Sequence, residues 1–285
     1  MALLEVGTGY PYTTVQAAVN AAPSGGTVRC NATGGNVYAE AVLVNNKRIR
    51  LVGGVNDLQA ITIAGAGAGA APALQVTGSG GVCVENLSFS NVGSAATYVV
   101  ELNVAEDWIS RCRIDGGGAK RCLEGQFGDN TLLFNGLRGV MPSCPGQVIL
   151  QHFTCVNMTQ QGLQGNVNNL DAKGCLAYNC NNLGYVNRLA AFCCWNAGDD
   201  ITPPGALSKT LVPLADISFI NYGGGNFFLN PGSLVYVPGV DILPFDITGR
   251  RRLRAGLDDR IYAGCYDPYP AAPAYLTGAS AIRVL

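Results

Sequence analysis

Aspartates are the side chains of this 285-residue sequence that could do acid–base chemistry. Two carboxylates on either side of a groove can hydrolyse glycosidic bonds, one as the acid and the other as base or nucleophile. Asp199 and Asp200 are adjacent, but they stand in a stretch rich in Gly and Pro, where Asp is a common turn residue. We therefore expect no catalytic residues. If the protein is an enzyme, the candidates are Asp115, Asp129, Asp199 and Asp200, with Asp171 as a further acid.

His152 is the only histidine of the chain. It stands between Gln151 and Phe153 in an alternating run, and no Ser or Cys motif partners it for nucleophilic catalysis. We expect a structural role, with the side chain pointing outward or paired with a neighbour. Glu106 and Asp107 belong to no catalytic motif, and we interpret them as ordinary turn residues.

The eleven cysteines indicate reduced core residues rather than disulfides or a metal site. Several fall at regular positions, where a small apolar side chain could stack on its equivalent in the next repeat: Cys83, Cys112, Cys155, Cys175 and Cys193. No Cys-x-x-Cys pair occurs, which disfavours zinc. We predict no metal and no cofactor.

Short apolar runs return between residues 82 and 219 at intervals of 18 to 26 residues. Their landmarks are Phe89, Cys112, Phe134, Cys155, Cys175, Cys193 and Phe219. The runs predict strands over 82–89, 108–114, 131–134, 147–155, 170–176, 190–194 and 216–219. Such a period is typical of a solenoid. The returns are rich in Gly, without the Leu-x-x-Leu-x-Leu pattern of leucine-rich repeats, so a parallel β-helix fits better.

The sequence thus predicts an all-β, single-domain, right-handed parallel β-helix with a short N-terminal capping helix. The capping helix is expected within residues 13–22, which are rich in alanine, place Val15, Ala18 and Val19 on one face and end at Pro23. We divide the chain into a lead-in with the capping helix (1–26), the β-helix (27–230) and a closing segment (231–285). A partial asparagine ladder is expected among Asn86, Asn91, Asn135, Asn157, Asn179 and Asn181.

The composition of the chain argues against nucleic acid and membranes as partners. Only 13% of residues are charged and the net charge is -1, so there is no electrostatic footprint for nucleic acid or for an anionic membrane surface. No run of about 18 apolar residues is present to span a membrane. The first residues lack a basic leader with an apolar core, and we expect synthesis in the cytosol.

Two stretches resemble known families. The N-terminal order Gly-Tyr-Pro-Tyr-Thr-Thr-Val-Gln-Ala-Ala-Val (residues 9–19), followed by Val-Tyr-Ala-Glu-Ala-Val-Leu-Val (37–44) and Arg-Ile-Arg-Leu-Val-Gly-Gly (48–54), is similar to the opening of pectin methylesterases and other pectin-lyase-like right-handed β-helix proteins. Residues 217–252 resemble the closing segment of bacterial and phage right-handed β-helix repeat proteins. The resemblance implies the fold more than an activity.

The catalytic motifs of these families are incomplete. The strand Ser110 to Gly116 resembles the methylesterase strand, but residues 117–120 are Gly-Gly-Ala-Lys where that family has its catalytic carboxylate. The fragment at Asp107 resembles pectate lyases without their histidine, and Asp199–Asp200 resemble the acid pair of polygalacturonases without their Gly-His-Gly.

We therefore expect a non-enzymatic structural protein of a larger assembly, foremost a bacteriophage virion component such as a capsid decoration, head-fibre or tail protein. Its expected partners are further copies of itself, a trimer being one arrangement, and other capsid or tail proteins. The alternatives are a polysaccharide-active enzyme or glycan-binding protein, and a bacterial surface β-helix protein that is extracellular.

Overall fold

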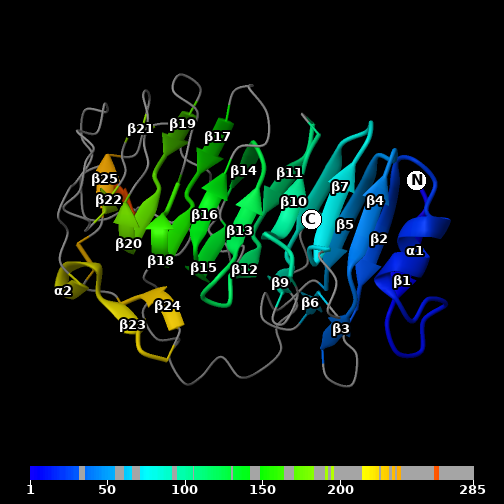
Figure 1. Cartoon of the computed structure of the whole chain (residues 1–285), viewed down its shortest axis with the longest axis horizontal. Coiled ribbons are helices and arrows are strands. Elements are labelled where there is room, and N and C mark those ends of the chain that lie inside the picture. The colour runs from blue at the N-terminus through cyan, green and yellow to red at the C-terminus, as the bar shows by residue number, and fades with distance from the viewer. Residues whose placement is uncertain are drawn as a thin grey trace, which may run out of the picture.

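The chain winds into an elongated coil of parallel strands (Figure 1). The computed structural model describes residues 1–31, 36–54, 61–65, 71–91, 95–104, 106–129, 131–141, 148–163, 170–182, 190–191, 194–195, 214–224, 226–230, 233–234, 236–238 and 260–262. Asp199 and Asp200 lie outside these residues, as does most of the predicted closing segment.

Three parallel sheets run along the coil, and we name them sheets A, B and C. In the described part of the chain, sheet A contains β1 (Leu3–Val6), β2 (Gly26–Cys30), β5 (Ile49–Gly53), β8 (Val82–Glu85), β11 (Trp108–Ser110), β14 (Phe127–Asp129), β17 (Val148–Gln151), β19 (Leu170–Lys173) and β21 (Ala190–Ala191). Sheet B contains β3 (Val37–Ala39), β6 (Thr62–Ala64), β9 (Ser88–Ser90), β12 (Arg113–Asp115), β15 (Leu132–Gly136), β18 (Thr154–Gln161), β20 (Leu176–Asn182) and β22 (Cys194–Trp195). Sheet C contains β4 (Val42–Asn45), β7 (Leu74–Thr77), β10 (Tyr98–Leu102), β13 (Arg121–Glu124) and β16 (Arg138–Met141).

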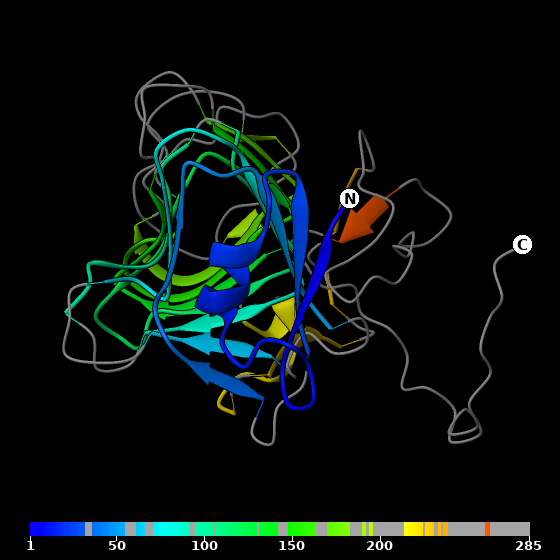
Figure 2. The same ribbon diagram turned by 90° about the vertical axis from the view of Figure 1, so that its right-hand side faces the viewer.

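From β2 to β16 each turn of the coil places one strand on each sheet in the order A, B, C, so neighbours within a sheet come from successive turns. From β17 to β22 the described strands alternate between sheets A and B. Gly128, Leu150 and Ala172 are consecutive partners in sheet A. The predicted all-β single-domain parallel β-helix is confirmed, and the winding is consistent with the right-handed crossovers of parallel strands. Figure 2, which looks at the N-terminal end, shows the three sheets surrounding one core.

The predicted single strands are in most cases two strands joined by a two-residue corner between sheets A and B. The first corner residue has a left-handed backbone at Asn86 (φ 57°), Arg111 (φ 51°), His152 (φ 54°) and Gly174 (φ 61°). The second points into the core and is almost fully buried: Leu87, Cys112, Phe153 and Cys175. The left-handed residue reverses the inward and outward alternation, which is why one apolar run continues across both strands.

The core is a continuous column of inward-facing aliphatic side chains with sulfur among them. Six of the described cysteines are buried: Cys30, Cys112, Cys122, Cys155, Cys175 and Cys180. The seven cysteines whose side chains the structure describes are free thiols, as predicted for reduced residues. Cys83 is half-exposed on β8, so its predicted place in the core is wrong.

The helix α1 (Val15–Ala21) closes the N-terminal mouth of the coil, with Val15, Ala18 and Val19 buried against the first turn (Figure 2). The hydroxyl of Thr14 accepts a hydrogen bond from the Ala17 N–H at 3.2 Å and caps the helix. The Glu40 carboxylate accepts hydrogen bonds from the N–H groups of Val15 and Gln16, where the helix dipole is positive. The capping helix expected from the sequence is therefore confirmed.

An asparagine ladder crosses three neighbouring strands of sheet B, β15, β18 and β20. The Asn179 side-chain amide donates to the Asn157 carbonyl at 2.8 Å, and the Asn157 amide donates to Asn135 at 3.1 Å. The predicted partial ladder is confirmed for these three residues. Asn86 belongs instead to the corner between sheets A and B, where its amide donates to the Gly54 carbonyl.

The prediction that residues 216–219, with the landmark Phe219, form a strand of a further turn of the coil is wrong. Residues 214–217 form the helix α2 (Leu214–Ile217), and β23 (Phe219–Asn221) pairs antiparallel with β24 (Asn226–Leu229). We call α2, β23 and β24 the clasp, because they lie against the outer face of sheet B (Figure 1). A second antiparallel pair joins β25 (Tyr236–Pro238) to β26 (Arg260–Tyr262).

Candidate functional site

The acids singled out from the sequence do not converge. Asp129 ends β14 on sheet A, whereas Asp115 ends β12 on sheet B and accepts a hydrogen bond from the Gly117 N–H at 3.0 Å in its own turn. Asp171 is in β19, and its side chain is not among those described. The described residues therefore contain no shared site built from these candidates.

Asp129 is nearly buried and accepts hydrogen bonds from the Trp108 indole N–H at 3.2 Å and the Ser110 hydroxyl at 2.5 Å. Both donors stand on β11, one turn earlier, so the carboxylate ties two turns together. The Trp108 ring stacks on Phe127 with centroids 6.4 Å apart and planes 4° apart. Sheet A thus carries two stacked aromatic rings here, and the carboxylate of Asp129 beside them is already hydrogen-bonded to Trp108 and Ser110.

Glu85, on β8 two turns before Asp129, has the same kind of role. Its carboxylate forms a two-point ion pair with Arg50, at 3.0 and 2.7 Å, and Arg111 lies 3.4 Å away. Burial raises the pKa of Glu85, but hydrogen bonds from Arg50 and Cys83 and the charges of Arg50 and Arg111 outweigh it, so the pKa lies below its ordinary value. A carboxylate held ionised between two arginines links strands β5, β8 and the corner after β11.

Asp107 is a buried carboxylate that the sequence interpretation placed in an ordinary turn. It is only 1% exposed and points inward beside β8, where it accepts hydrogen bonds from the N–H groups of Val82 at 2.8 Å and Val104 at 3.0 Å. Burial raises its pKa to about 6, with a small contribution from the charge of Glu106, against the lowering effect of the two N–H donors. The residue joins two turns of backbone.

His152 is also buried, at 2% exposed, so its side chain is covered and does not face solvent. A Cβ atom built on Gly174 would come within 2.6 Å of the His152 ring. The imidazole thus packs on Gly174, at the corner of the next turn, and leaves no room for a side chain at that position. This is a packing role.

Sequence reasoning missed one pair of carboxylates, Glu101 on β10 and Glu124 on β13. They are direct partners in sheet C and lie half-buried on its outer face. The Gln75 amide donates to Glu101 at 3.0 Å, and the Asn103 amide donates to its other oxygen. Within the described part of the chain, no donor bonds to Glu124, and burial followed by the charge of Glu101 raises its pKa, partly offset by Arg121. The two acids therefore occupy different environments.

Beside this pair, the Arg121 guanidinium donates to the Tyr98 hydroxyl at 2.8 Å and lies 5.3 Å from the centre of the Tyr98 ring. Tyr98 and Arg121 are also direct partners on β10 and β13. Sheet C thus presents a cation, a phenol and two carboxylates on two adjacent turns. The 23-residue separation of Glu101 and Glu124 equals the interval between the landmarks Phe89 and Cys112, and it was the signal available in the sequence.

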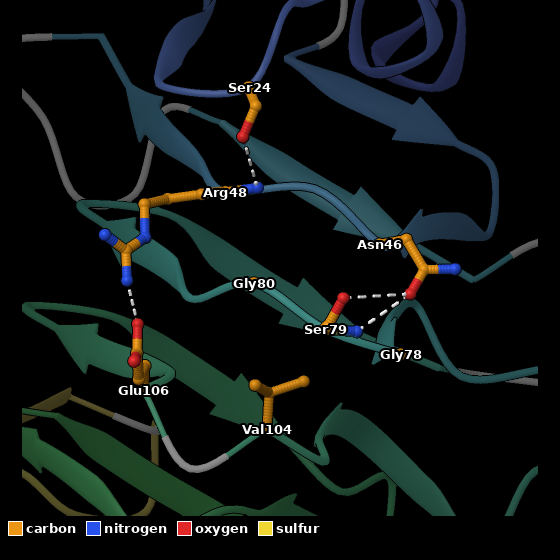
Figure 3. A pocket seen from close by; sticks show the side chains of 8 residues that line it. All are labelled: Ser24, Asn46, Arg48, Gly78, Ser79, Gly80, Val104 and Glu106. Carbon is orange, nitrogen blue, oxygen red and sulfur yellow. Dashed lines mark hydrogen bonds and ion pairs between the residues drawn. The ribbon is translucent and has the colours of Figure 1, made fainter.

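A shallow hollow of about 700 Å³ lies at the corner between sheets C and A (Figure 3). The Arg48 guanidinium reaches across it to form an ion pair with Glu106, and the Asn46 carbonyl accepts hydrogen bonds from the N–H and the hydroxyl of Ser79. Its charges are paired and exposed, so the hollow offers little to a ligand.

The described ranges contain no group of three or more His, Cys, Asp or Glu side chains arranged to hold a metal ion. Over the same ranges, no helix has the length and apolar character needed to cross a membrane. No model of a known protein family matches the sequence, and no curated protein matches it. The fold by itself therefore assigns the class: a parallel β-helix protein.

Proposed function

We propose that this protein is a non-enzymatic structural β-helix of a larger assembly, and specifically a bacteriophage virion component such as a capsid decoration, head-fibre or tail protein. The observation that carries the proposal is that three of its acidic side chains form bonds within the coil. Glu85, Asp107 and Asp129 each bond to a neighbouring turn of the coil, which suits a rigid rod more than a reactive surface. A solenoid is stiff along its length because every turn packs on the next.

The resemblance of both ends of the chain to pectin-lyase-like and phage β-helix repeat proteins supports the same proposal. The low charge also suits a protein packed in many copies. The test is to purify virions from cells infected by the phage that encodes the chain, and to quantify its peptides against the major capsid protein. We expect a fixed ratio through successive density gradients. Peptides found only in the soluble lysate would contradict the proposal.

A second function is favoured by the pair on sheet C. Neighbouring strands are about 4.8 Å apart, so the backbones of the direct partners Glu101 and Glu124 are spaced so that their carboxyl groups could reach the separation of about 5–5.5 Å used by retaining glycosidases. Glu124, whose pKa is raised, would donate the proton, and Glu101, held by two amide donors, would be the nucleophile. The substrate class would be a polysaccharide lying along sheet C.

Release of reducing ends from a panel of polysaccharides tests this second function. Hydrolysis should fall by at least about 100-fold in Glu124→Gln and Glu101→Gln. Glu106→Gln is the matched control, because Glu106 belongs to an exposed ion pair at the neighbouring corner. Equal hydrolysis by all variants, or none by the wild type, would rule out an enzyme at this pair.

A further inference from the structure

One row of polar side chains crosses three successive turns on the outer face of sheet C. Gln75 on β7 is the direct partner of Glu101 on β10, and Glu101 is the direct partner of Glu124 on β13 (Figure 1). All three side chains are half-buried. Side chains at matching positions of neighbouring parallel strands lie on the same face, with backbones about 4.8 Å apart. Long side chains in such a row can hydrogen-bond from one turn to the next, as Gln75 does to Glu101.

The row is hydrogen-bonded at its first step and open at its second. The Gln75 amide donates to one oxygen of Glu101 at 3.0 Å, and the Asn103 amide donates to the other. Glu124 accepts no hydrogen bond from any residue that the structure describes. Ionised carboxylates are acceptors only, and two of them opposite each other in a sheet repel. The second step of the row therefore lacks a donor.

A proton on Glu124 supplies that donor. A protonated carboxyl group carries one O–H donor, and a hydrogen bond from it to a carboxylate is of the strong, charge-assisted kind. Glu101 can accept it, because each carboxylate oxygen has two lone pairs and a single amide donor. Burial, followed by the charge of Glu101, raises the pKa of Glu124, and Arg121 offsets this in part. The environment thus favours the proton on Glu124 rather than on Glu101.

The charged groups beside the pair are two arginines. Arg121 stands on the same strand as Glu124, and its guanidinium donates to the Tyr98 hydroxyl at 2.8 Å. Arg138 on β16 is the direct partner of Arg121 and donates to Gln160 at 2.7 Å. On the far side of Glu124 the row continues with Met141, which is uncharged. In the described structure neither arginine donates to Glu124, so the missing donor is not supplied by a cation.

We propose that Glu101 and Glu124 hold one proton between them in mildly acidic solution, and that this proton completes a side-chain ladder from Gln75 to Glu124 across three turns of sheet C. The proton comes from solvent, because both carboxyl groups are partly exposed. It replaces a repulsion between two turns with a hydrogen bond. The coil is therefore held together more firmly in mild acid than at neutral pH, and this stabilisation is lost as the pH rises. The inference goes beyond both proposed functions and depends on neither.

Urea unfolding of the full chain at pH 5 and pH 8 tests the ladder. A glutamine at position 124 is uncharged and has an amide donor at every pH, so Glu124→Gln carries the completed ladder permanently. At pH 8 its unfolding equilibrium constant should be about two- to fivefold smaller than that of the wild type. At pH 5 the wild type gains its own donor, and the difference should disappear. The titration of Asp107 is common to both proteins and cancels in the comparison.

Glu106→Gln is the matched control, because it removes one negative charge from an exposed ion pair outside the row. It should show no gain at pH 8 that is lost at pH 5. No gain at pH 8 for Glu124→Gln, or the same gain at both values of pH, would overturn the ladder.

Carboxyl-carbon NMR of the wild type follows the proton directly, with the Glu124 signal identified by its absence from Glu124→Gln. We expect Glu124 to titrate above its ordinary pKa in the wild type, and its pKa to fall in Glu101→Gln, which removes the charge of the acceptor. A Glu124 signal that titrates at its ordinary pKa, or that Glu101→Gln leaves unmoved, would contradict the shared proton.

Discussion

The side-chain amide of Gln16 pairs with both backbone polar groups of Leu43. Its carbonyl accepts from the Leu43 N–H at 2.6 Å and its NH₂ donates to the Leu43 carbonyl at 3.1 Å. Gln16 is on α1 and Leu43 is on β4, the first strand of sheet C, so the amide takes the place of a missing strand. The edge of sheet C at this position is thereby closed against pairing with another chain.

Lys47 holds the other end of the same helix. Its ammonium group donates to the carbonyls of Val19, Asn20 and Ala22, where the helix dipole is negative. Lys47→Met should lower the free energy of unfolding in urea by about 1–2 kcal/mol. Arg29→Met, which removes only an exposed ion pair with Glu5, should cost less than about 1 kcal/mol. Equal losses in the two variants would show that Lys47 does not anchor the helix.

Asp107 should make the protein more stable in mild acid. Its pKa is about 6 when folded and near 3.8 when unfolded, so the folded state binds the proton more tightly. The contribution of Asp107 to the free energy of unfolding therefore rises as the pH falls from 7 to 4, by up to about 3 kcal/mol, and is constant below that. Glu85 acts in the opposite direction, because its pKa is lowered and its stabilisation is lost as the pH falls below about 4.5.

Urea unfolding of the wild type and Asp107→Asn between pH 4 and 8 measures this effect. The asparagine variant should be less stable throughout, since one acceptor is lost, and its stability should rise less than that of the wild type between pH 7 and 5. Parallel curves for the two proteins would contradict the assignment to Asp107.

Six buried thiols should be unreactive in the native protein. Burial raises the pKa of Cys112 and of Cys180 to about 12, and the thiolate is the reactive form. Cys83 is half-exposed, but burial and the neighbouring Glu85 raise its pKa to about 12, so it should react slowly at pH 8. Alkylation followed by peptide mass mapping should find the six buried cysteines unmodified until urea is added. Rapid native labelling of Cys112 would show that the core opens.

Gly53 should not tolerate a side chain. A Cβ atom there would lie 1.9 Å from the carbonyl oxygen of Asn86, a backbone atom of the next turn. Gly53→Ala should lower the free energy of unfolding by about 3 kcal/mol. Gly223→Ala is the control, because no atom lies within 4 Å of the new methyl group. A thermal melt of both variants compares them, and an unchanged melting temperature for Gly53→Ala would be the contrary result.

The sequence predicted the coil because the core repeats its chemistry once per turn, as at Phe89 and Cys155. It did not reveal strands of sheet C such as β10 and β13, since runs such as Arg121 to Glu124 are short and lack strict alternation. Phe219 was assigned to a further turn, although the longer interval before it and the prolines at 203, 204 and 213 indicated a change of structure.

The acids show the limit of inspecting residue types alone. Asp115 and Asp129 are 14 residues apart, which is out of phase with the turn and places them on different sheets. Glu101 and Glu124 are one turn apart and become direct neighbours. Only the register, which is set by corner residues such as Asn86 and Arg111, decides which acids meet.

The constant spacing from Gly128 to Leu150 and from Leu150 to Ala172 has a practical consequence for the length of the molecule. Removing or duplicating the 22 residues from 129 to 150 changes the rod by one layer, about 4.8 Å, while every remaining side chain keeps its inward or outward direction. Removing 21 residues instead would turn a whole strand inside out. The rod can therefore be lengthened only in whole turns.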